Sequence, residues 1–191
     1  PGAYKPPHRE HLNMAKHYAK QTDHVYIIIS PGDRGGGSNE AVVTPKESRQ
    51  IWNMYLNDAG IGNITIEEMP SELHSPVQAS IEWIVEKSYS ISNSCIVLGA
   101  STKLDKNGKP DYERFDRGYI EDYIRGEGVE EVEILEPGDP SHVYHATVDM
   151  SATTFREALI QKDYNLIKEF IPEDSLHRIE DIFKILDISS E

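Results

Sequence analysis

The pattern of apolar and polar positions divides the chain into strand-like and helix-like blocks. Short apolar or alternating runs at 24–30, 63–69 and 129–135 predict strands. The run SCIVLG at 94–99 predicts a strand buried on both faces, because it contains almost no polar position. The run VYHATV at 143–148 predicts a last strand. These runs supply the strands of one predicted sheet.

Between the strands, apolar residues recur at three- and four-residue spacing, which predicts helices. The first helix follows the opening PGAYKPPHREH, and two more begin after Thr44 and Ser75, each an N-cap residue followed by proline. A helix over 155–170 and an amphipathic helix over 173–186 close the chain. We expect the final helix to pack either on the domain or on a second copy of the chain.

Strand and helix blocks alternate without a linker or an internal repeat. This alternation predicts an α/β fold with a mostly parallel sheet flanked by helices, in a single domain over 1–191 with C-terminal helices at about 157–191. The stretch PGDRGGGS at 31–38 predicts a flexible surface loop, because it lacks the Lys-Ser/Thr ending of a phosphate-binding P-loop. The polar stretch 102–128 is expected to carry surface charge or, alternatively, to form a mobile flap over a site.

Composition restricts the classes of partner. The net charge of −14 argues against nucleic acid, whose binding draws on Lys and Arg that neutralise phosphates. No apolar run has the length of a membrane span, so no membrane partner is expected. The single cysteine, Cys95, excludes an internal disulfide and a multi-cysteine zinc site, which favours a cytoplasmic location. Its apolar neighbours predict a buried structural thiol.

The candidate chemistry is concentrated in the opening PGAYKPPHREH. After Gly2, two histidines, His8 and His11, stand three residues apart where a helix is predicted to begin. Lys5 and Arg9 add positive charge beside them. Since a helix N-terminus offers free backbone N–H groups and a favourable dipole for anions, this stretch predicts a phosphate site.

The stretch resembles the H-x-G-H signature of the nucleotidylyltransferase superfamily. Members of that family move a nucleoside monophosphate from a triphosphate onto a phosphate-bearing acceptor and release pyrophosphate. A second match, SATTFR over 151–156, resembles the family's S-x-T-x-x-R signature. The resemblance spans about 1–160 and implies a Rossmann-like sheet. Because the family's first motif follows directly on a first β-strand, that strand is expected to be missing before Pro1.

The resemblance also implies roles for individual residues. His8, His11 and Arg156 are the implied catalytic residues. The implied nucleotide-binding residues are those of the two motifs and of a strand-end turn, namely Gly2, Lys5, Gly99, Ser151 and Thr153. Four polar residues at predicted strand ends or helix starts are weaker candidates for binding the acceptor, namely Arg34, Arg49, His74 and Ser75. Mg²⁺ is implied as a cofactor bound mainly through the substrate phosphates, so no residue is assigned as a metal ligand.

Two positions depart from the family pattern. Glu10 stands where the family has glycine between the histidines, so its side chain either narrows the pocket or turns outward. Ser101 stands where many relatives carry aspartate. These departures keep open a second interpretation, a nucleotide-binding module of the same fold that has lost turnover. A third, plainer one treats the histidines as ordinary surface residues and Ser151 as a simple N-cap.

The expected partners are therefore a nucleoside triphosphate and a small phosphorylated acceptor. The chain length and the S-x-T-x-x-R ending resemble nicotinate or nicotinamide mononucleotide and pantetheine-phosphate adenylyltransferases more than cytidylyltransferases, which implies AMP transfer from ATP. A class I aminoacyl-tRNA synthetase domain shares an H-x-G-H turn. That class is disfavoured because a K-M-S-K-S motif is absent and the net charge is wrong for tRNA.

Overall fold

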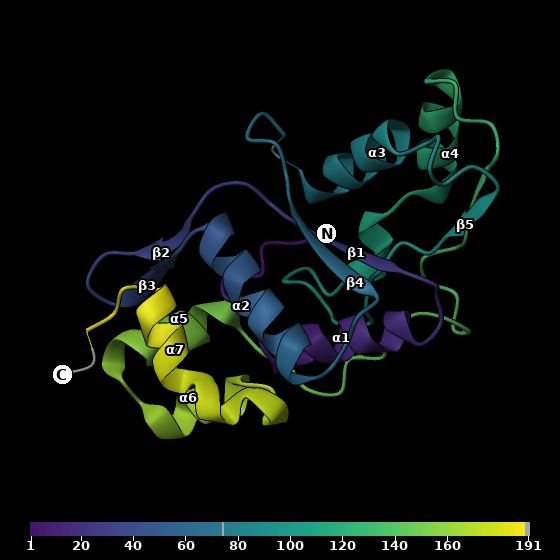
Figure 1. The fold of residues 1–191 in the computed structure, drawn as a ribbon. Coiled ribbons are helices and arrows are strands. Elements are labelled where there is room, and N and C mark those ends of the chain that lie inside the picture. Colours follow the sequence, from purple (N-terminus) through teal and green to yellow (C-terminus); the bar gives the residue numbers. More distant parts are fainter. Residues whose placement is uncertain (74, 190–191) are drawn as a thin grey trace.

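The computed structural model describes residues 1–73 and 75–189, and it is an α/β fold (Figure 1). The helices are α1 (Arg9–Ala19), α2 (Pro45–Asp58), α3 (Pro76–Glu86), α4 (Arg117–Gly126), α5 (Ala152–Gln161), α6 (Tyr164–Phe170) and α7 (Ile179–Ile185), with 3-10 helices η1 (Asp111–Arg114) and η2 (Glu173–Arg178). The strands are β1 (Val25–Ile29), β2 (Arg34–Gly36), β3 (Glu40–Val43), β4 (Ile64–Glu68), β5 (Ser94–Ile96) and β6 (Val132–Ile134).

Two parallel strand pairs form the centre of the fold. In one, β1 runs beside β4 with Val25 opposite Ile64, and in the other β5 runs beside β6 with Ser94 opposite Val132. Gly2 adds a parallel bridge to Ile29, on the edge of β1 that faces away from β4. The residues that lead into α1 therefore begin at the carboxyl end of β1. The predicted Rossmann-like α/β class is confirmed, while a strand before Pro1 stays a prediction.

The two largest of the three apolar clusters among the described residues hold these layers together. The larger lies between the β1–β4 pair, α1, α2 and the C-terminal helices, and its fully buried members include Ile29, Trp52 and Phe155. The smaller joins α3 and α4 to β5 and β6 through residues such as Ile84 and Ile120. In Figure 1 the C-terminal helices lie together with the β2–β3 hairpin, at the opposite end of the molecule from α3 and α4. Trp52 is a core residue, as the sequence predicts.

Most predicted elements form where the patterns place them. Strands β1, β4 and β6 lie within their predicted runs. Thr44 caps α2 in a reciprocal pattern with Glu47, and the Ser75 hydroxyl accepts a hydrogen bond from the backbone N–H of Gln78 at the start of α3. No helix among the described residues is long and apolar enough to cross a membrane.

The prediction of a flexible loop over 31–38 is wrong. Arg34–Gly36 forms strand β2, which pairs antiparallel with β3. Gly35 has a φ of +87°, and a Cβ at this position would lie 2.0 Å from the carbonyl oxygen of Ala41. Glycine is therefore required for the hairpin to close, so the glycines that suggested a loop in the sequence build a strand pair.

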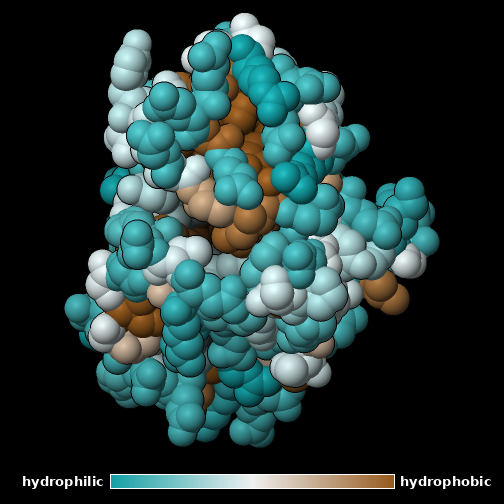
Figure 2. All heavy atoms as spheres, turned by 90° about the vertical axis from the view of Figure 1, so that its right-hand side faces the viewer, coloured by the Kyte–Doolittle hydropathy of each residue, from teal (hydrophilic) through white to brown (hydrophobic). Residues whose placement is uncertain are grey.

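The predicted buried strand at 94–99 is also corrected. Only Ser94–Ile96 forms β5, and Cys95 is exposed instead of buried. In the part of the chain that the structure describes, β5 pairs with β6 and with no other strand. Figure 2 shows hydrophobic residues in a hollow on the side of the molecule where β5 lies. An apolar run thus predicts a strand but does not determine how deeply the strand is buried.

Three further differences concern the C-terminal half. The run 143–148 forms no strand, and Tyr144 makes only an isolated parallel bridge to Ser101. The helix predicted over 155–170 is interrupted at Lys162, whose φ of 54° is left-handed and ends α5. The final amphipathic segment begins as the 3-10 helix η2 before α7, which leaves Leu176 41% exposed.

Candidate functional site

The two histidines of the first motif form a reciprocal cap at the start of α1. His8 is the N-cap, and its Nδ1 accepts a hydrogen bond from the backbone N–H of His11 at 3.4 Å. The Nδ1 of His11 accepts from the backbone N–H of His8 at 3.2 Å. The rings stack with centroids 3.6 Å apart and an interplanar angle of 11°. Since both Nδ1 atoms are acceptors, each neutral ring carries its proton on Nε2.

The surroundings hold both imidazoles neutral. Burial lowers the pKa of His8 to about 4, and the positive charges of Lys103 and Arg9 act in the same direction. Burial, together with His8 and Lys103, holds the pKa of His11 well below its ordinary value. At neutral pH the pair therefore offers Nε2–H hydrogen-bond donors, and no positive charge, to a ligand.

The second motif opens α5. The Ser151 hydroxyl accepts a hydrogen bond from the backbone N–H of Thr154 at 3.3 Å, and both Ser151 and Thr153 are exposed. Arg156, in contrast, is only 8% exposed. The first turn of α5 thus presents two hydroxyl groups to solvent while its arginine points into the protein.

Arg156 joins the two motifs to each other. Its Nη1 donates to the carbonyl oxygen of Lys5 at 2.7 Å, and its Nη2 donates to the hydroxyl of Thr153 at 3.1 Å. Its Nε pairs with a carboxylate oxygen of Glu40 on β3 at 2.9 Å. The guanidinium therefore connects α5, β3 and the segment that precedes α1, and much of its charge is compensated by Glu40.

Lys5 and Gly2 are likewise engaged by the protein itself. Lys5 is 1% exposed, and its Nζ donates to the carbonyl oxygen of Ser30 at 2.6 Å, just after β1 ends. Burial and the nearby Arg34 lower the pKa of Lys5 to about 8, against the influence of Asp33. A Cβ at Gly2 would lie 3.0 Å from the ring of Tyr4, so glycine lets that ring approach the backbone.

Glu10 turns towards the segment that leads to α5. Its carboxylate accepts hydrogen bonds from the Tyr144 hydroxyl at 2.9 Å, the Thr147 N–H at 3.1 Å and the Asn13 amide at 3.1 Å. Burial by itself would raise its pKa, but these hydrogen bonds outweigh burial and the pKa is lowered. The sequence left open whether this side chain narrows the pocket or turns outward. Neither alternative describes it fully, because Glu10 is buried and hydrogen-bonded to other residues of the protein.

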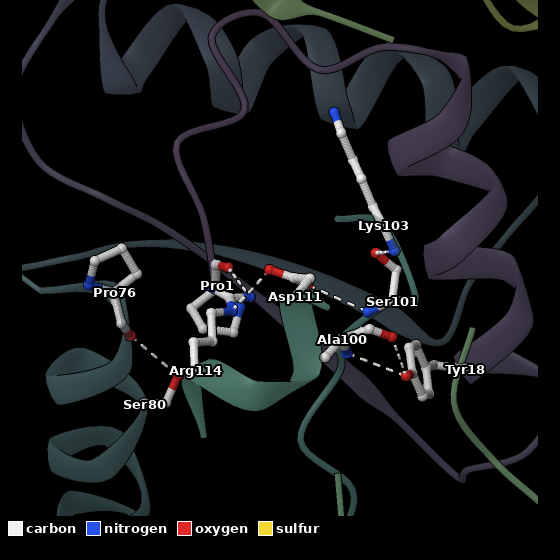
Figure 3. Close-up of polar contacts among 9 residues, drawn as sticks. All are labelled: Pro1, Tyr18, Pro76, Ser80, Ala100, Ser101, Lys103, Asp111 and Arg114. Carbon is white, nitrogen blue, oxygen red and sulfur yellow. Dashed lines mark hydrogen bonds and ion pairs between the residues drawn. The ribbon is translucent and has the colours of Figure 1, made fainter. Parts of the chain in front are cut away.

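The turn after β5 forms a polar network, drawn in Figure 3. The Tyr18 hydroxyl donates to the carbonyl oxygen of Ala100 at 2.6 Å and accepts from its N–H. The N–H of Ser101 donates to the carboxylate of Asp111 at 3.2 Å, and Asp111 pairs with Arg114 at 3.1 Å. Where the resemblance expects an aspartate, the chain has Ser101 with the Asp111 carboxylate bonded to its backbone.

Gly99, also in this turn, is not required by a close approach. A Cβ at that position would make an ordinary contact of 3.5 Å with the ring of Tyr18. Its assignment to nucleotide binding stays a prediction.

Of the four acceptor candidates, the three that the structure describes, Arg34, Arg49 and Ser75, lie on or beside separate elements. Arg34 is exposed on β2, and Arg49 pairs with Glu68 at 3.6 Å on the surface. The Ser75 hydroxyl is used as the cap of α3. His74 lies outside the described residues. Along the chain, Arg34 follows β1 and Ser75 follows β4, and ligands in open α/β sheets bind at the carboxyl edge of the parallel strands.

Two residues near the site were missed from the sequence. Lys103 donates from Nζ to the carbonyl oxygen of Met150, and Asp111 reaches back to Ser101 across the Leu104–Pro110 bridge. The available signal was the DKNGKPD turn, which reverses the chain after the β5 run.

Comparison with known proteins supports the fold. No protein-family model matches the sequence, and no curated protein matches it. Among solved structures, the chain is similar to the crystal structure of a bifunctional NMN adenylyltransferase/ADP ribose pyrophosphatase from Francisella tularensis, with a TM-score of 0.51 and 19% identity. The match covers 97% of this chain and 48% of that one, so this chain spans about half the length of that protein. At this identity the likeness shows the Rossmann-like α/β fold alone.

Proposed function

We propose that this chain is a nucleotidylyltransferase that moves AMP from ATP onto a small phosphorylated acceptor. The observation that carries the proposal is the joining of the two motifs, since Arg156 of α5 bonds the carbonyl oxygen of Lys5 just before the histidine cap. This bond connects the first turn of α5 with the segment that leads into α1. The N-terminus of each of these helices favours an anion through its backbone N–H groups and its dipole.

The reaction needs positioning more than covalent chemistry from the protein. An oxygen of the acceptor phosphate attacks the α-phosphorus of ATP, the bond from that phosphorus to the bridging oxygen breaks, and pyrophosphate leaves with the electron pair. The protein lowers the barrier by aligning the three groups in line and by compensating charge that moves to the leaving group.

The residues of the two motifs have separate roles in the proposed reaction. The neutral His8 and His11 would donate Nε2–H hydrogen bonds to the phosphate chain at the start of α1. Ser151 and Thr153, both exposed at the start of α5, would donate from their hydroxyls to the departing phosphates. Arg156 would act mainly by positioning these two helices, because its guanidinium is bound to Glu40 and Lys5.

In this proposal Mg²⁺ is bound to the phosphates of ATP, and the donors of the site bind phosphate oxygens. The described residues contain no group of three or more His, Cys, Asp or Glu side chains placed to hold a metal ion. The site's neutral imidazole, hydroxyl and ammonium donors suit phosphate oxygens, while Mg²⁺ prefers oxygen ligands and retains water. Magnesium would therefore arrive on the ATP phosphates.

A second candidate, a nucleotide-binding module without turnover, draws on a specific observation. Both Arg156 and Glu10 are occupied by contacts within the protein. An arginine whose guanidinium is paired with Glu40 supplies less positive charge to a transition state. The structural neighbour is a bifunctional NMN adenylyltransferase, which makes nicotinamide mononucleotide the first acceptor to try.

The test is pyrophosphate release with Mg²⁺, using ATP or CTP against a panel of phosphorylated acceptors that includes nicotinamide mononucleotide. We expect release with ATP and one acceptor. His11→Ala should lower that rate by well over tenfold, since it removes a transition-state hydrogen bond worth roughly 2 kcal/mol or more. The matched control is His177→Ala, which removes an exposed histidine of η2. Nucleotide binding without release across the panel would favour the second candidate, and an unchanged rate in His11→Ala would contradict the site.

A further inference from the structure

Lys103 lies in the turn after β5, and its backbone is fixed on both sides. Its N–H donates to the hydroxyl oxygen of Ser101 at 3.3 Å, and its carbonyl oxygen accepts from the N–H of Asp111 at 2.8 Å. Figure 3 shows its side chain extending away from the Asp111–Arg114 pair. The polar network of this turn therefore sets the direction in which the ammonium group extends.

The ammonium group of Lys103 reaches the start of the second motif. Its Nζ donates to the carbonyl oxygen of Met150 at 2.9 Å and pairs with a carboxylate oxygen of Asp149 at 3.2 Å. Met150 directly precedes Ser151, the N-cap of α5. The side chain of Lys103 is 46% exposed and that of Asp149 is 88% exposed. An ion pair this exposed is weak and can exchange for another anion.

The same ammonium acts on the first motif. Its positive charge is one of the causes, after burial, that lower the pKa of both His8 and His11. Such an effect requires proximity, because charge interactions fall with distance and are screened by water and salt. Lys103 thus contacts the residue before the N-cap of α5, and its charge also acts on the two histidines at the start of α1.

Two other basic groups of the motifs, Arg156 and Lys5, are compensated or anchored. Arg156 pairs with Glu40, and the Nζ of Lys5 is buried against Ser30. The histidine pair is neutral at pH 7 for the reasons given above. A bound triphosphate carries several negative charges, so a site built from these groups alone would leave much of that charge without a counter-charge.

We propose that Lys103 binds the β- and γ-phosphates of the nucleoside triphosphate, with the ammonium exchanging Asp149 for phosphate oxygens. The inference rests on the proposed function, since it names a further residue of the same site. It also predicts a specific selectivity. A residue that contacts only the outer phosphates should strengthen the binding of a triphosphate and leave a monophosphate unaffected.

The experiment compares Lys103→Met and Lys103→Arg with Lys106→Met as the matched control. Lys106 is exposed in the same turn, so its substitution removes the same charge from the same loop. Binding of Mg·ATP and of AMP is measured by calorimetry on each folded protein. We expect Lys103→Met to weaken Mg·ATP by about tenfold or more, as for loss of a charge-assisted contact, with AMP within about twofold. Lys103→Arg should keep much of the affinity, and Lys106→Met should match the unchanged protein.

The outcomes separate this inference from the proposed function. If the unchanged protein binds Mg·ATP and Lys103→Met binds it equally well, or loses ATP and AMP to the same extent, the role of Lys103 is wrong while the function stands. If the unchanged protein binds no nucleotide, both are wrong. A readout independent of nucleotide is the NMR titration of the imidazoles, in which Lys103→Met should raise the pKa of His8. Absence of any change would contradict the placement of the ammonium beside the histidines.

Discussion

The carboxylate of Glu10, in the first turn of α1, accepts a hydrogen bond from the hydroxyl of Tyr144 at 2.9 Å. The same carboxylate accepts from the backbone N–H of Thr147 at 3.1 Å. These contacts connect the histidine motif to the segment that runs into Ser151. The residue that departs from the family pattern is thus used to hold the two motifs in place.

This contact predicts the effect of restoring the family's glycine. Glu10→Gly should lower the free energy of unfolding by about 2 to 4 kcal/mol, because it removes hydrogen bonds to a charged group and places glycine in a helix. Glu10→Gln should lower the free energy of unfolding by less, because the amide oxygen of glutamine still accepts hydrogen bonds. The measurement is urea denaturation, with Glu169→Gln on the exposed face of α6 as the control. A stability unchanged in Glu10→Gly would show that the contact contributes nothing.

The buried histidine cap predicts a dependence of stability on pH. His8 has a folded-state pKa of about 4, against an ordinary value of 6.5, so the unfolded chain binds more protons between these values. The contribution of His8 to the free energy of unfolding is fully present above about pH 6.5. It is lost as the pH falls towards 4, by roughly 2 kcal/mol between pH 8 and pH 5. Urea denaturation across that range should show the loss. His8→Asn, which keeps an N-cap, should make the profile shallower while His11 keeps its own contribution, and His177→Asn should leave the slope as it is.

The Arg156–Glu40 pair predicts a structural cost as well as any effect on turnover. The side chains are 10% and 27% exposed, and the arginine makes two further hydrogen bonds. Arg156→Ala should therefore destabilise the protein by about 3 kcal/mol, because Glu40 and the carbonyl oxygen of Lys5 lose their partner. The control is Arg49→Ala, whose partner Glu68 is at the surface and whose loss should cost less than about 1 kcal/mol. Equal costs for the two variants in urea denaturation would contradict this assignment.

The exposure of Cys95 predicts that its thiol reacts in the folded protein. A disulfide reagent should modify one thiol per chain without denaturant. The reaction should be slower than that of a free cysteine, because burial and the charge of Glu133 raise the thiol pKa. Modification that appears only in denaturant would mean that the thiol is covered in solution.

The sequence determined the local elements of this protein. Thr44 and Ser75 begin helices because a hydroxyl followed by proline satisfies a helix start within one turn of chain. The β-branched run at 25–29 forms a strand, and the two histidines form a cap, since each pattern depends on residues a few positions apart. The candidate motifs were recognisable for the same reason.

Only the tertiary structure decided what those residues contact. Arg156 bonds Glu40 and Glu10 bonds Tyr144, at separations of 116 and 134 residues along the chain. Cys95 is exposed although it lies in an apolar run, and Lys103 bonds Met150, which lies 47 residues away at the start of the second motif. Periodicity along a chain records which residues favour burial or a helix face. It carries no information on which distant segment supplies the partner, and that pairing is fixed by strand order and by packing.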